Sequence, residues 1–226
     1  MKQARVVVFD YGMGNIRSVS RACAKAGGDV RVVTDPGDFD PSLTDGLVLP
    51  GQGHFGACVQ RLRTVGLDQA VLDWVQEDRP FLGICVGMQI LAEWSEEDSA
   101  PGLGVLPGRC VRVGGPGLTV PHMGWDCQTW PVQTRLFAGT APGTRFYYCH
   151  SYGLSPGLGH GVEETVSSYG VPFLAALERS NLWATQFHPE KSSADGLVLW
   201  ENFLASCLAA RSSPPVSGAR VSEREA

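Results

Sequence analysis

The sequence predicts a single α/β domain built on an open, mixed but mainly parallel sheet of flavodoxin-like type, with helices on both faces. Three observations support this prediction. Short apolar runs alternate with longer helical segments over the first 94 residues, as they do in parallel sheets. Glycine-rich turns follow several of these runs, and shorter β-branched runs replace the alternation in the second half. A chain of 226 residues is also long enough to bury one substantial core.

Four apolar runs in the first half are typical of buried parallel strands, because they are short and bounded by turn residues. They lie at residues 5–10, 29–33, 46–49 and 80–84. Helical sequence follows the first run to about Ala26, with Asn15 as its N-cap. It follows the third run as far as Asp78, and the fourth run from Val86 to Trp94. Strands and helices therefore alternate.

From residue 101 onward glycine and proline become frequent and the apolar runs shorten, which favours antiparallel strands. Strands are expected at residues 108–113, 146–152, 161–167, 172–177 and 182–187, with a loop or sheet edge at 120–126. An amphipathic segment at 195–210 predicts a closing helix. Residues 211–226 have no apolar face to bury, so the domain is expected to span residues 1–210 and the tail to be disordered.

The composition argues against several classes of function. A net charge of −5 disfavours nucleic acid as the main partner. No apolar run approaches the roughly 20 residues that cross a bilayer, and no cleavage-site pattern follows the start, so a cytoplasmic protein without a membrane span is expected. Seven cysteines without a C-x-x-C pair suit a reducing compartment and predict no metal site. No cofactor is expected either, because Arg17 replaces the third glycine of a nucleotide-binding fingerprint.

Cys85 lies where a buried strand passes directly into a helix, with Gly83 and Gly87 on either side. This arrangement matches the Gly-x-nucleophile-x-Gly elbow, in which small neighbours permit a strained turn that lifts a reactive side chain above the sheet. The free N–H groups and the positive end of the helix dipole favour a thiolate at that corner. The alternative is a tight buried turn without chemistry.

A thiol nucleophile needs a base, and the base needs a group that orients it. His188 and Glu190 are separated by Pro189, which disfavours helical geometry, so the two side chains project to the same side of an extended segment. The pair follows an expected strand, as Cys85 does, and open parallel sheets place their active sites along that edge. The alternative is that both side chains belong to a solvated loop.

Acyl transfer also needs N–H donors for the developing oxyanion. The backbone N–H of Val86 is the first candidate. The loop of Gly51, Gln52 and Gly53 after the neighbouring strand is the second, because glycines let a backbone amide turn toward a substrate at little steric cost. Pro-Gly-x-Gly sequences also occur in ordinary turns, which is the alternative for this loop.

Three motifs together resemble the class I, or triad-type, glutamine amidotransferases, over about residues 6–208. They are the elbow at 83–89, the loop at 50–53 and the His-Pro-Glu sequence at 188–190. Three further stretches, at 10–15, 121–125 and 148–152, are similar to the glutaminase subunits of imidazole glycerol phosphate synthase, of histidine biosynthesis. The triad motifs are shared by the whole family, whereas these three stretches are more specific.

The resemblance implies that Cys85 attacks the side-chain amide of glutamine, with His188 as general base and then acid, and with Glu190 holding the imidazole. Ammonia leaves, and water hydrolyses the glutamyl thioester to glutamate. In the same way the resemblance implies a set of groups that hold the substrate. These are Gln89, Glu97, which would face the ammonium group of glutamine, and the backbone of His150, Ser151 and Tyr152.

Each of these substrate-holding residues has an alternative interpretation. Gln89 would otherwise be an exposed helix residue, and Glu97 part of a solvated acidic run. His150 and Tyr152 would be ordinary packed strand residues.

The resemblance further implies a partner, a (β/α)₈-barrel cyclase subunit that forms a heterodimer with this chain and receives its ammonia. There ammonia joins a phosphoribulosyl formimino intermediate and yields imidazole glycerol phosphate and an aminoimidazole carboxamide ribotide. Asn15, Trp125 and Lys191 match positions that face the partner. A helix cap, a core aromatic and a surface charge are the respective alternatives.

Two residues depart from the family pattern. Gln52 stands where a small apolar residue is frequent, with little expected effect because the loop acts through its backbone, and Asp126 stands where asparagine is usual. Two competing functions are a glutaminase of anthranilate, pyridoxal phosphate or purine synthesis, and a docking protein that keeps the fold without the reaction. The first leaves stretches 10–15 and 121–125 without a use, and the intact triad speaks against the second.

Overall fold

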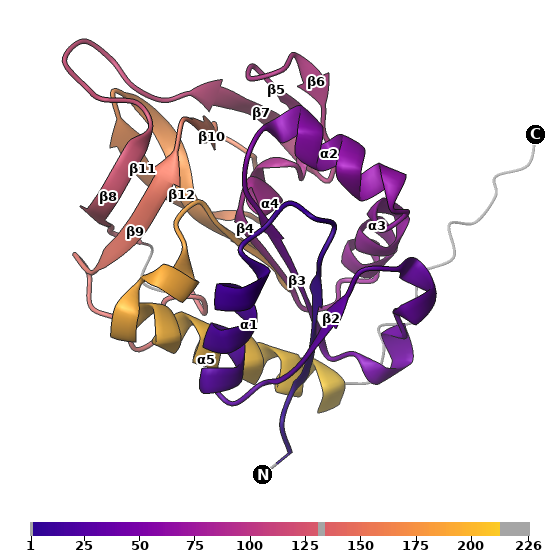
Figure 1. The fold of residues 1–226 in the computed structure, drawn as a ribbon. Helices are drawn as coiled ribbons and strands as arrows, with labels where there is room; N and C mark the ends of the chain where they lie inside the picture. The colour runs from indigo at the N-terminus through magenta and orange to yellow at the C-terminus, as the bar shows by residue number, and fades with distance from the viewer. Residues whose placement is uncertain (1, 131–133, 213–226) are drawn as a thin grey trace, which may run out of the picture.

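The computed structural model describes residues 2–130 and 134–212 of the chain (Figure 1). Its strands are β1 (Arg5–Phe9), β2 (Asp29–Val33), β3 (Gly46–Gly51), β4 (Phe81–Cys85), β5 (Ala92–Ser95), β6 (Ala100–Pro101), β7 (Leu106–Arg112), β8 (His122–Cys127), β9 (Arg145–His150), β10 (Tyr152–Leu154), β11 (Glu163–Tyr169), β12 (Val171–Arg179) and β13 (Leu182–Thr185). Its α-helices are α1 (Ile16–Lys25), α2 (Phe55–Thr64), α3 (Asp68–Gln76), α4 (Val86–Gln89) and α5 (Ser193–Ser212), with short 3₁₀ turns η1 (Pro36–Asp38), η2 (Pro41–Leu43) and η3 (Pro189–Lys191). From residue 213 the expected tail lies outside the described residues, and the boundary at residue 210 stays a prediction.

The central sheet has seven strands in the order β11-β12-β13-β4-β3-β1-β2. The five strands from β13 to β2 are parallel, whereas β12 and β11 are antiparallel additions at one edge. Every residue of β3 and β4 is buried, as a central parallel strand covered on both faces requires. Four strands, β10-β7-β5-β6, form a second sheet, and β8 pairs with β9 in a third. The prediction of a mixed, mainly parallel open sheet is confirmed.

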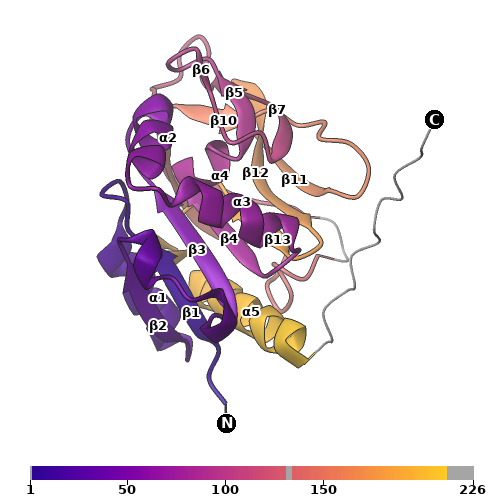
Figure 2. The same cartoon turned by 90° about the vertical axis from the view of Figure 1, so that its right-hand side faces the viewer.

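Helices cover both faces of the central sheet, as the sequence predicts. α1 and α5 lie on one face (Figure 1), where Phe203 of α5 packs edge-on against Trp183 of β13. α2 and α3 lie on the other face and are in front of the strands in Figure 2. There Trp74 of α3 contacts Phe39, which in turn contacts Phe9 of β1. The two helical layers bury both sides of β3 and β4 and leave their carboxyl ends for the site.

The helix expected from Val86 to Trp94 is wrong, because α4 ends at Gln89 and the chain then enters β5. Ile90 and Leu91 are fully buried, so this segment has no polar face to turn toward solvent. The carbonyl oxygen of Leu91 accepts hydrogen bonds from the N–H groups of residues 105 and 106 instead of continuing a helix. Tertiary pairing therefore overrides helix propensity.

Three smaller boundaries also differ from the prediction. The helical stretch expected to end at Asp78 is two helices, α2 and α3, divided at Gly66, whose φ of +75° ends the first of them. The expected strand at 146–152 is split into β9 and β10, and the expected loop at 120–126 contains strand β8. β7 pairs antiparallel with β10 but parallel with β5. In the part of the chain that the structure describes, no helix is long and apolar enough to cross a bilayer.

Candidate active site

Cys85 ends β4 and opens α4 with φ of 54° and ψ of −113°, a conformation that is costly for a residue with a Cβ. Its glycine neighbours hold the strained turn by close packing. A Cβ on Gly87 would lie 1.8 Å from the carbonyl oxygen of Leu49 in β3, and one on Gly83 would lie 3.0 Å from the carbonyl oxygen of Gly87. The chain at Cys85 therefore has the sharp elbow that the sequence predicts.

The sulfur of Cys85 lies among polar groups although the residue is only 3% exposed. Its Sγ is 3.6 Å from Nε2 of Gln186 and 4.0 Å from the carbonyl oxygen of Cys149. It also forms a hydrogen bond with the ring of His188. These three neighbours come from the segments that follow β13 and from β9, so strands far apart in the sequence enclose the thiol.

His188 and Glu190 are both buried, so the solvated-loop alternative is wrong for this pair. Nδ1 of His188 is 2.8 Å from Oε1 of Glu190, which leaves Nε2 for the side facing Cys85. Burial would lower the pKa of His188, but the sulfur of Cys85 and the carboxylate of Glu190 outweigh it and raise the pKa to about 10. The imidazole therefore carries a proton at neutral pH, paired with the sulfur on one side and the carboxylate on the other.

Asn15 has a different local role from the expected helix cap. It stands at the N-cap position of α1, but its side-chain amide reaches across to the triad. Nδ2 of Asn15 donates to Oε1 of Glu190 at 3.4 Å, the same oxygen that contacts His188. Asn15 therefore helps to hold the carboxylate that orients the imidazole, and a role toward a partner stays a prediction.

The loop proposed to supply oxyanion donors lies directly beside the elbow. Gly51 pairs with Cys85 between β3 and β4, and a Cβ on Gly51 would lie 2.5 Å from the backbone nitrogen of Gly87, so only glycine fits. Gly53 adopts φ of +99°. The backbone N–H of Gln52 donates to the carbonyl oxygen of Met13 at 3.2 Å and is thereby engaged. The loop must turn before Gln52 can donate to a substrate.

Gln89 is 2% exposed, so the alternative of an exposed helix residue is wrong. Its Nε2 donates to the carbonyl oxygen of Tyr152 at 2.6 Å and to Oε1 of Gln186 at 2.9 Å. His150 is also buried, and its Nδ1 donates to the same carbonyl at 2.9 Å. Ser151 and Tyr152 are half-buried. The structure thus brings the backbone of 149–152 beside the thiol through Gln89 and Gln186.

Burial lowers the pKa of His150 to about 3, while the hydrogen bond to Tyr152 acts weakly in the opposite direction. The unfolded chain takes up a proton at this histidine below about pH 6.5, but the folded chain does not until about pH 3. Stability from neutral His150 is therefore fully present above pH 6.5 and is lost as the pH falls through this window.

We expect His150→Gln to reduce this loss. The free energy of unfolding, measured with urea from pH 7.5 to 5, should fall less steeply in the variant than in the parent, by up to about 1.4 kcal/mol per pH unit. Identical slopes for the two chains would contradict a neutral buried His150.

Glu97 lies at the N-terminus of α2, where its Oε2 accepts from the backbone N–H of Phe55 at 2.7 Å and its Oε1 is 3.2 Å from Nδ1 of His54. Asp98 accepts from the N–H of Gly56 at 2.8 Å. The ligand atoms of His54, Glu97 and Asp98 lie within 4.8 Å of one another, so this is a group in the described ranges that could hold a metal ion. Its two carboxylates already cap the helix. A role for Glu97 toward the ammonium group of glutamine stays a prediction.

Trp125 is 49% exposed, so the core-aromatic alternative is wrong. It lies on β8, and its ring contacts Tyr147 of β9 edge-on. Nζ of Lys191 lies 5.7 Å from the centre of the same tyrosine ring. Trp125, Tyr147 and Lys191 therefore form one exposed face near the triad, and Met123 extends it with 61% exposure.

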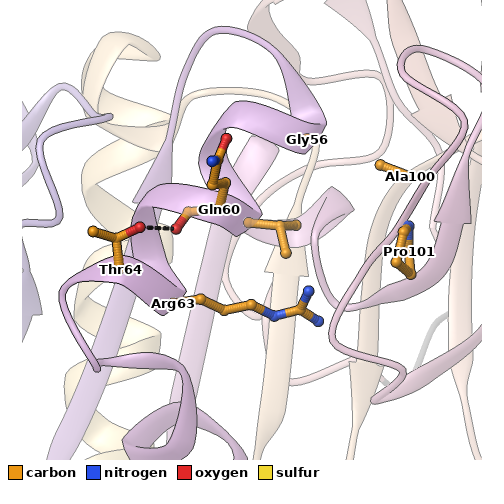
Figure 3. A pocket seen from close by; sticks show the side chains of 7 residues that line it. Gly56, Gln60, Arg63, Thr64, Ala100 and Pro101 are labelled. Carbon is orange, nitrogen blue, oxygen red and sulfur yellow. Dashed lines mark hydrogen bonds between the residues drawn. The ribbon is translucent and has the colours of Figure 1, made fainter.

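A surface hollow of about 410 Å³ lies between α2 and β6 (Figure 3). It is lined by Gly56, Val59, Gln60, Arg63, Thr64, Ala100 and Pro101. None of these residues belongs to the triad or to the expected glutamine-binding set. The chemistry of the thiol and imidazole, rather than the size of this hollow, identifies the active site.

Gln186 is the residue of the site that motif matching does not find. It follows β13 and stands two residues before His188, so in an extended segment both side chains project to the same side. That alternation is the signal that could have indicated it. As arranged, the site can form a thiolate beside a protonated imidazole, which is the resting state of a cysteine nucleophile for acyl transfer.

Comparisons with known proteins agree with this geometry. The family model described as glutamine amidotransferase class-I matches residues 7–207. A relative named imidazole glycerol phosphate synthase subunit HisH, from Thermobifida fusca (strain YX), is 43% identical over 214 residues, which cover 90% of this chain and 99% of the relative. A relative of the same name from Synechococcus sp. (strain JA-3-3Ab) is 41% identical over 206 residues, covering 90% and 94%.

Two solved structures share the fold at lower identity. A GMP synthase protein from Thermoplasma acidophilum has a TM-score of 0.71 at 22% identity, covering 93% of this chain and 97% of that one. PurLQS from Thermotoga maritima has a TM-score of 0.68 at 18% identity, covering 93% and 100%. Since the family model spans most of the chain and the HisH relatives match over nearly their whole length, the chain belongs to the class I glutamine amidotransferase family, in the group of HisH subunits.

Proposed function

We propose that this chain is the glutaminase subunit of imidazole glycerol phosphate synthase, which hydrolyses glutamine and passes the ammonia to a cyclase subunit in histidine biosynthesis. The observation that carries the proposal is a thiol on a strained elbow, hydrogen-bonded to an imidazole that Glu190 holds at 2.8 Å. The identity to HisH subunits supports this enzyme over the glutaminases of anthranilate, pyridoxal phosphate or purine synthesis. The complete triad argues against a docking protein without activity.

The reaction begins when the thiolate of Cys85 attacks the side-chain carbonyl carbon of glutamine. The carbonyl oxygen takes the negative charge, and protonated His188 gives its proton to the amide nitrogen as the C–N bond breaks. Ammonia leaves, and a glutamyl thioester remains on Cys85. His188 then removes a proton from water, the water oxygen attacks the thioester, and glutamate leaves as the thiolate returns. Glu190 keeps the imidazole in one orientation through both halves.

The oxyanion is proposed to accept from the backbone N–H of Val86 and from the loop of Gly51, Gln52 and Gly53. The hydrogen bond from Gln52 to Met13 supports a loop that is not yet aimed at the substrate. Binding of the partner and its ligand would have to turn this peptide. Such a step couples glutamine hydrolysis to the presence of an acceptor for ammonia.

Glutamine is proposed to be held by Gln89, by Glu97 at its ammonium group, and by the backbone from His150 to Tyr152. The buried position of Gln89 next to the elbow and the closeness of residue 149 to Sγ support this assignment. Glu97 already acts as an acceptor at the start of α2, the helix that follows the oxyanion loop.

The partner is proposed to be a (β/α)₈-barrel cyclase in a heterodimer, docked on the face of Trp125 and Lys191 with Asn15 behind it. The half-exposed indole of Trp125 supports this choice, because large exposed aromatics are enriched in interfaces. The cyclase would use the ammonia to form imidazole glycerol phosphate and an aminoimidazole carboxamide ribotide. All seven cysteines lie in the described ranges and are free, which supports a reducing compartment such as the cytoplasm.

One assay tests the proposal: glutamate formation from glutamine by the chain alone, then with the cyclase, then with the cyclase and its formimino ribotide. Because an oxyanion donor is worth about 10²–10³ in rate, we expect the isolated chain to be at least roughly a hundredfold slower than the full complex. Full turnover by the isolated chain would contradict the loop mechanism. Stimulation by the acceptor enzyme of anthranilate or purine synthesis, and not by the cyclase, would assign the chain to a sister enzyme.

A further inference from the structure

We infer that Gln186 is a positioning residue for the nucleophile: its side-chain amide, locked in one orientation by Gln89 and the carbonyl of Tyr152, presents an N–H to the sulfur of Cys85. The four groups form one continuous path. Nε2 of Gln186 is 3.6 Å from Sγ, its Oε1 is 2.9 Å from Nε2 of Gln89, and that Nε2 is 2.6 Å from the carbonyl oxygen of Tyr152.

The orientation of both amides follows from the one group that has no choice. A backbone carbonyl oxygen only accepts, so the end of Gln89 that faces Tyr152 must be its NH₂ group. The second hydrogen of that NH₂ points to Gln186, whose facing atom must therefore be the carbonyl oxygen. The NH₂ of Gln186 is then left for the sulfur. Turning the amide of Gln186 around would place an oxygen against Sγ and two NH₂ groups against each other.

The carbonyl of Tyr152 is itself fixed from a second direction. Nδ1 of His150 donates to it at 2.9 Å, and Nε2 of the same ring faces Nδ1 of His122 at 3.1 Å. Both lone pairs of the carbonyl oxygen are thus used. Because Gln89 and Gln186 are 2% and 0% exposed, no solvent competes along the path.

An N–H that points at the sulfur stabilises the thiolate more than the thiol, because hydrogen bonds to a charged acceptor are the stronger ones. Gln186 has no titration of its own, so this contribution is constant with pH. The ionisable groups around Cys85 are His188 with Glu190 behind it, Tyr11 after β1 and Cys58 on α2. The amide adds to the effect of His188 and also limits where the sulfur can lie.

The test is the pH dependence of alkylation of Cys85 by iodoacetamide, followed for its own peptide by mass spectrometry so that the other six cysteines do not interfere. In Gln186→Met, which keeps the length and removes the N–H, we expect the midpoint of this profile to rise by about one pH unit. Alkylation well below the midpoint would then be roughly tenfold slower than in the parent. An unchanged midpoint in the folded variant would overturn the inference.

Two more variants separate orientation from simple packing. Gln89→Met does not touch the sulfur, but it frees the amide of Gln186, so it should raise the midpoint in the same direction. The double variant should then show no larger change than Gln186→Met alone, because both remove one path. Additive changes would contradict a path through Gln89.

Gln128→Met is the matched control, because Gln128 is another buried glutamine, with its Nε2 on Oγ of Ser167 at 3.2 Å. It should leave the Cys85 profile unchanged, and exposed Cys127 should react alike in every variant. If Gln186→Met does not fold, Gln186→Asn, which keeps the amide but withdraws it from the sulfur, should give the same upward change. The assay uses neither glutamine nor a partner, so its failure is separate from failure of the proposed function.

Discussion

Cys85→Ser is expected to abolish glutamine hydrolysis while the chain still binds the cyclase. The elbow would keep its shape, since serine differs from cysteine by one atom and the side chain is buried. A hydroxyl, however, is far harder to deprotonate than a thiol, and His188 is arranged for a sulfur that is already charged. Glutamate formation, measured with cyclase and ribotide present, should fall on the order of a thousandfold or more. Titration calorimetry should show an unchanged affinity for the cyclase.

Cys23→Ser is the matched control for this experiment. Cys23 is fully buried in α1, and burial raises the pKa of its thiol to about 12, so the thiol is inert. This variant should lose some stability but retain glutaminase activity. A Cys85→Ser chain that still turns over near the parent rate would remove Cys85 from its role.

Gly87→Ala is expected to have the second largest effect, because it acts on the elbow itself. The added Cβ would lie 1.8 Å from the carbonyl oxygen of Leu49, and backbone atoms on a buried strand cannot move aside cheaply. Either β3 and α4 separate or the chain leaves the strained conformation at Cys85. We expect the free energy of unfolding to drop by about 1–3 kcal/mol or more, and glutaminase activity to fall by at least roughly a hundredfold.

Gly115→Ala is a matched control, since a Cβ there would meet its nearest neighbour at 3.5 Å, an ordinary contact. Chemical unfolding and glutamate formation should both stay near the parent values. A Gly87→Ala chain of parent stability and activity would show that the close approach of α4 to β3 is not needed for the elbow.

The parallel core of the fold is predictable because its strands are short buried runs that the local sequence marks. β2 lies where it was expected, and β1, β3 and β4 differ from expectation by one or two residues. The segment after Gln89 could not be predicted in the same way. Its apolar residues fit a helix as well as a strand, and the choice was made by pairing with residues 100–110, which local sequence does not encode.

The candidate site divides in the same manner. Cys85, His188 and Glu190 are recognisable because each belongs to a short motif with a local geometric requirement. The roles of Asn15 and Gln186 were not recognisable, since Asn15 reaches Glu190 across 175 positions and Gln186 reaches Cys85 across 101. Such contacts exist only after distant segments have packed.

By itself, the sequence determined the alternating elements, the glycine-flanked elbow, and the His-Pro-Glu order that keeps base and carboxylate on one side. These features depend on steric and backbone preferences over a few residues. Only the tertiary structure decided that the thiol meets the imidazole, because β13 pairs with β4 and brings Thr185 beside Ile84. It also decided which way each buried amide points, since that choice is made by hydrogen-bond partners that lie far away in the chain.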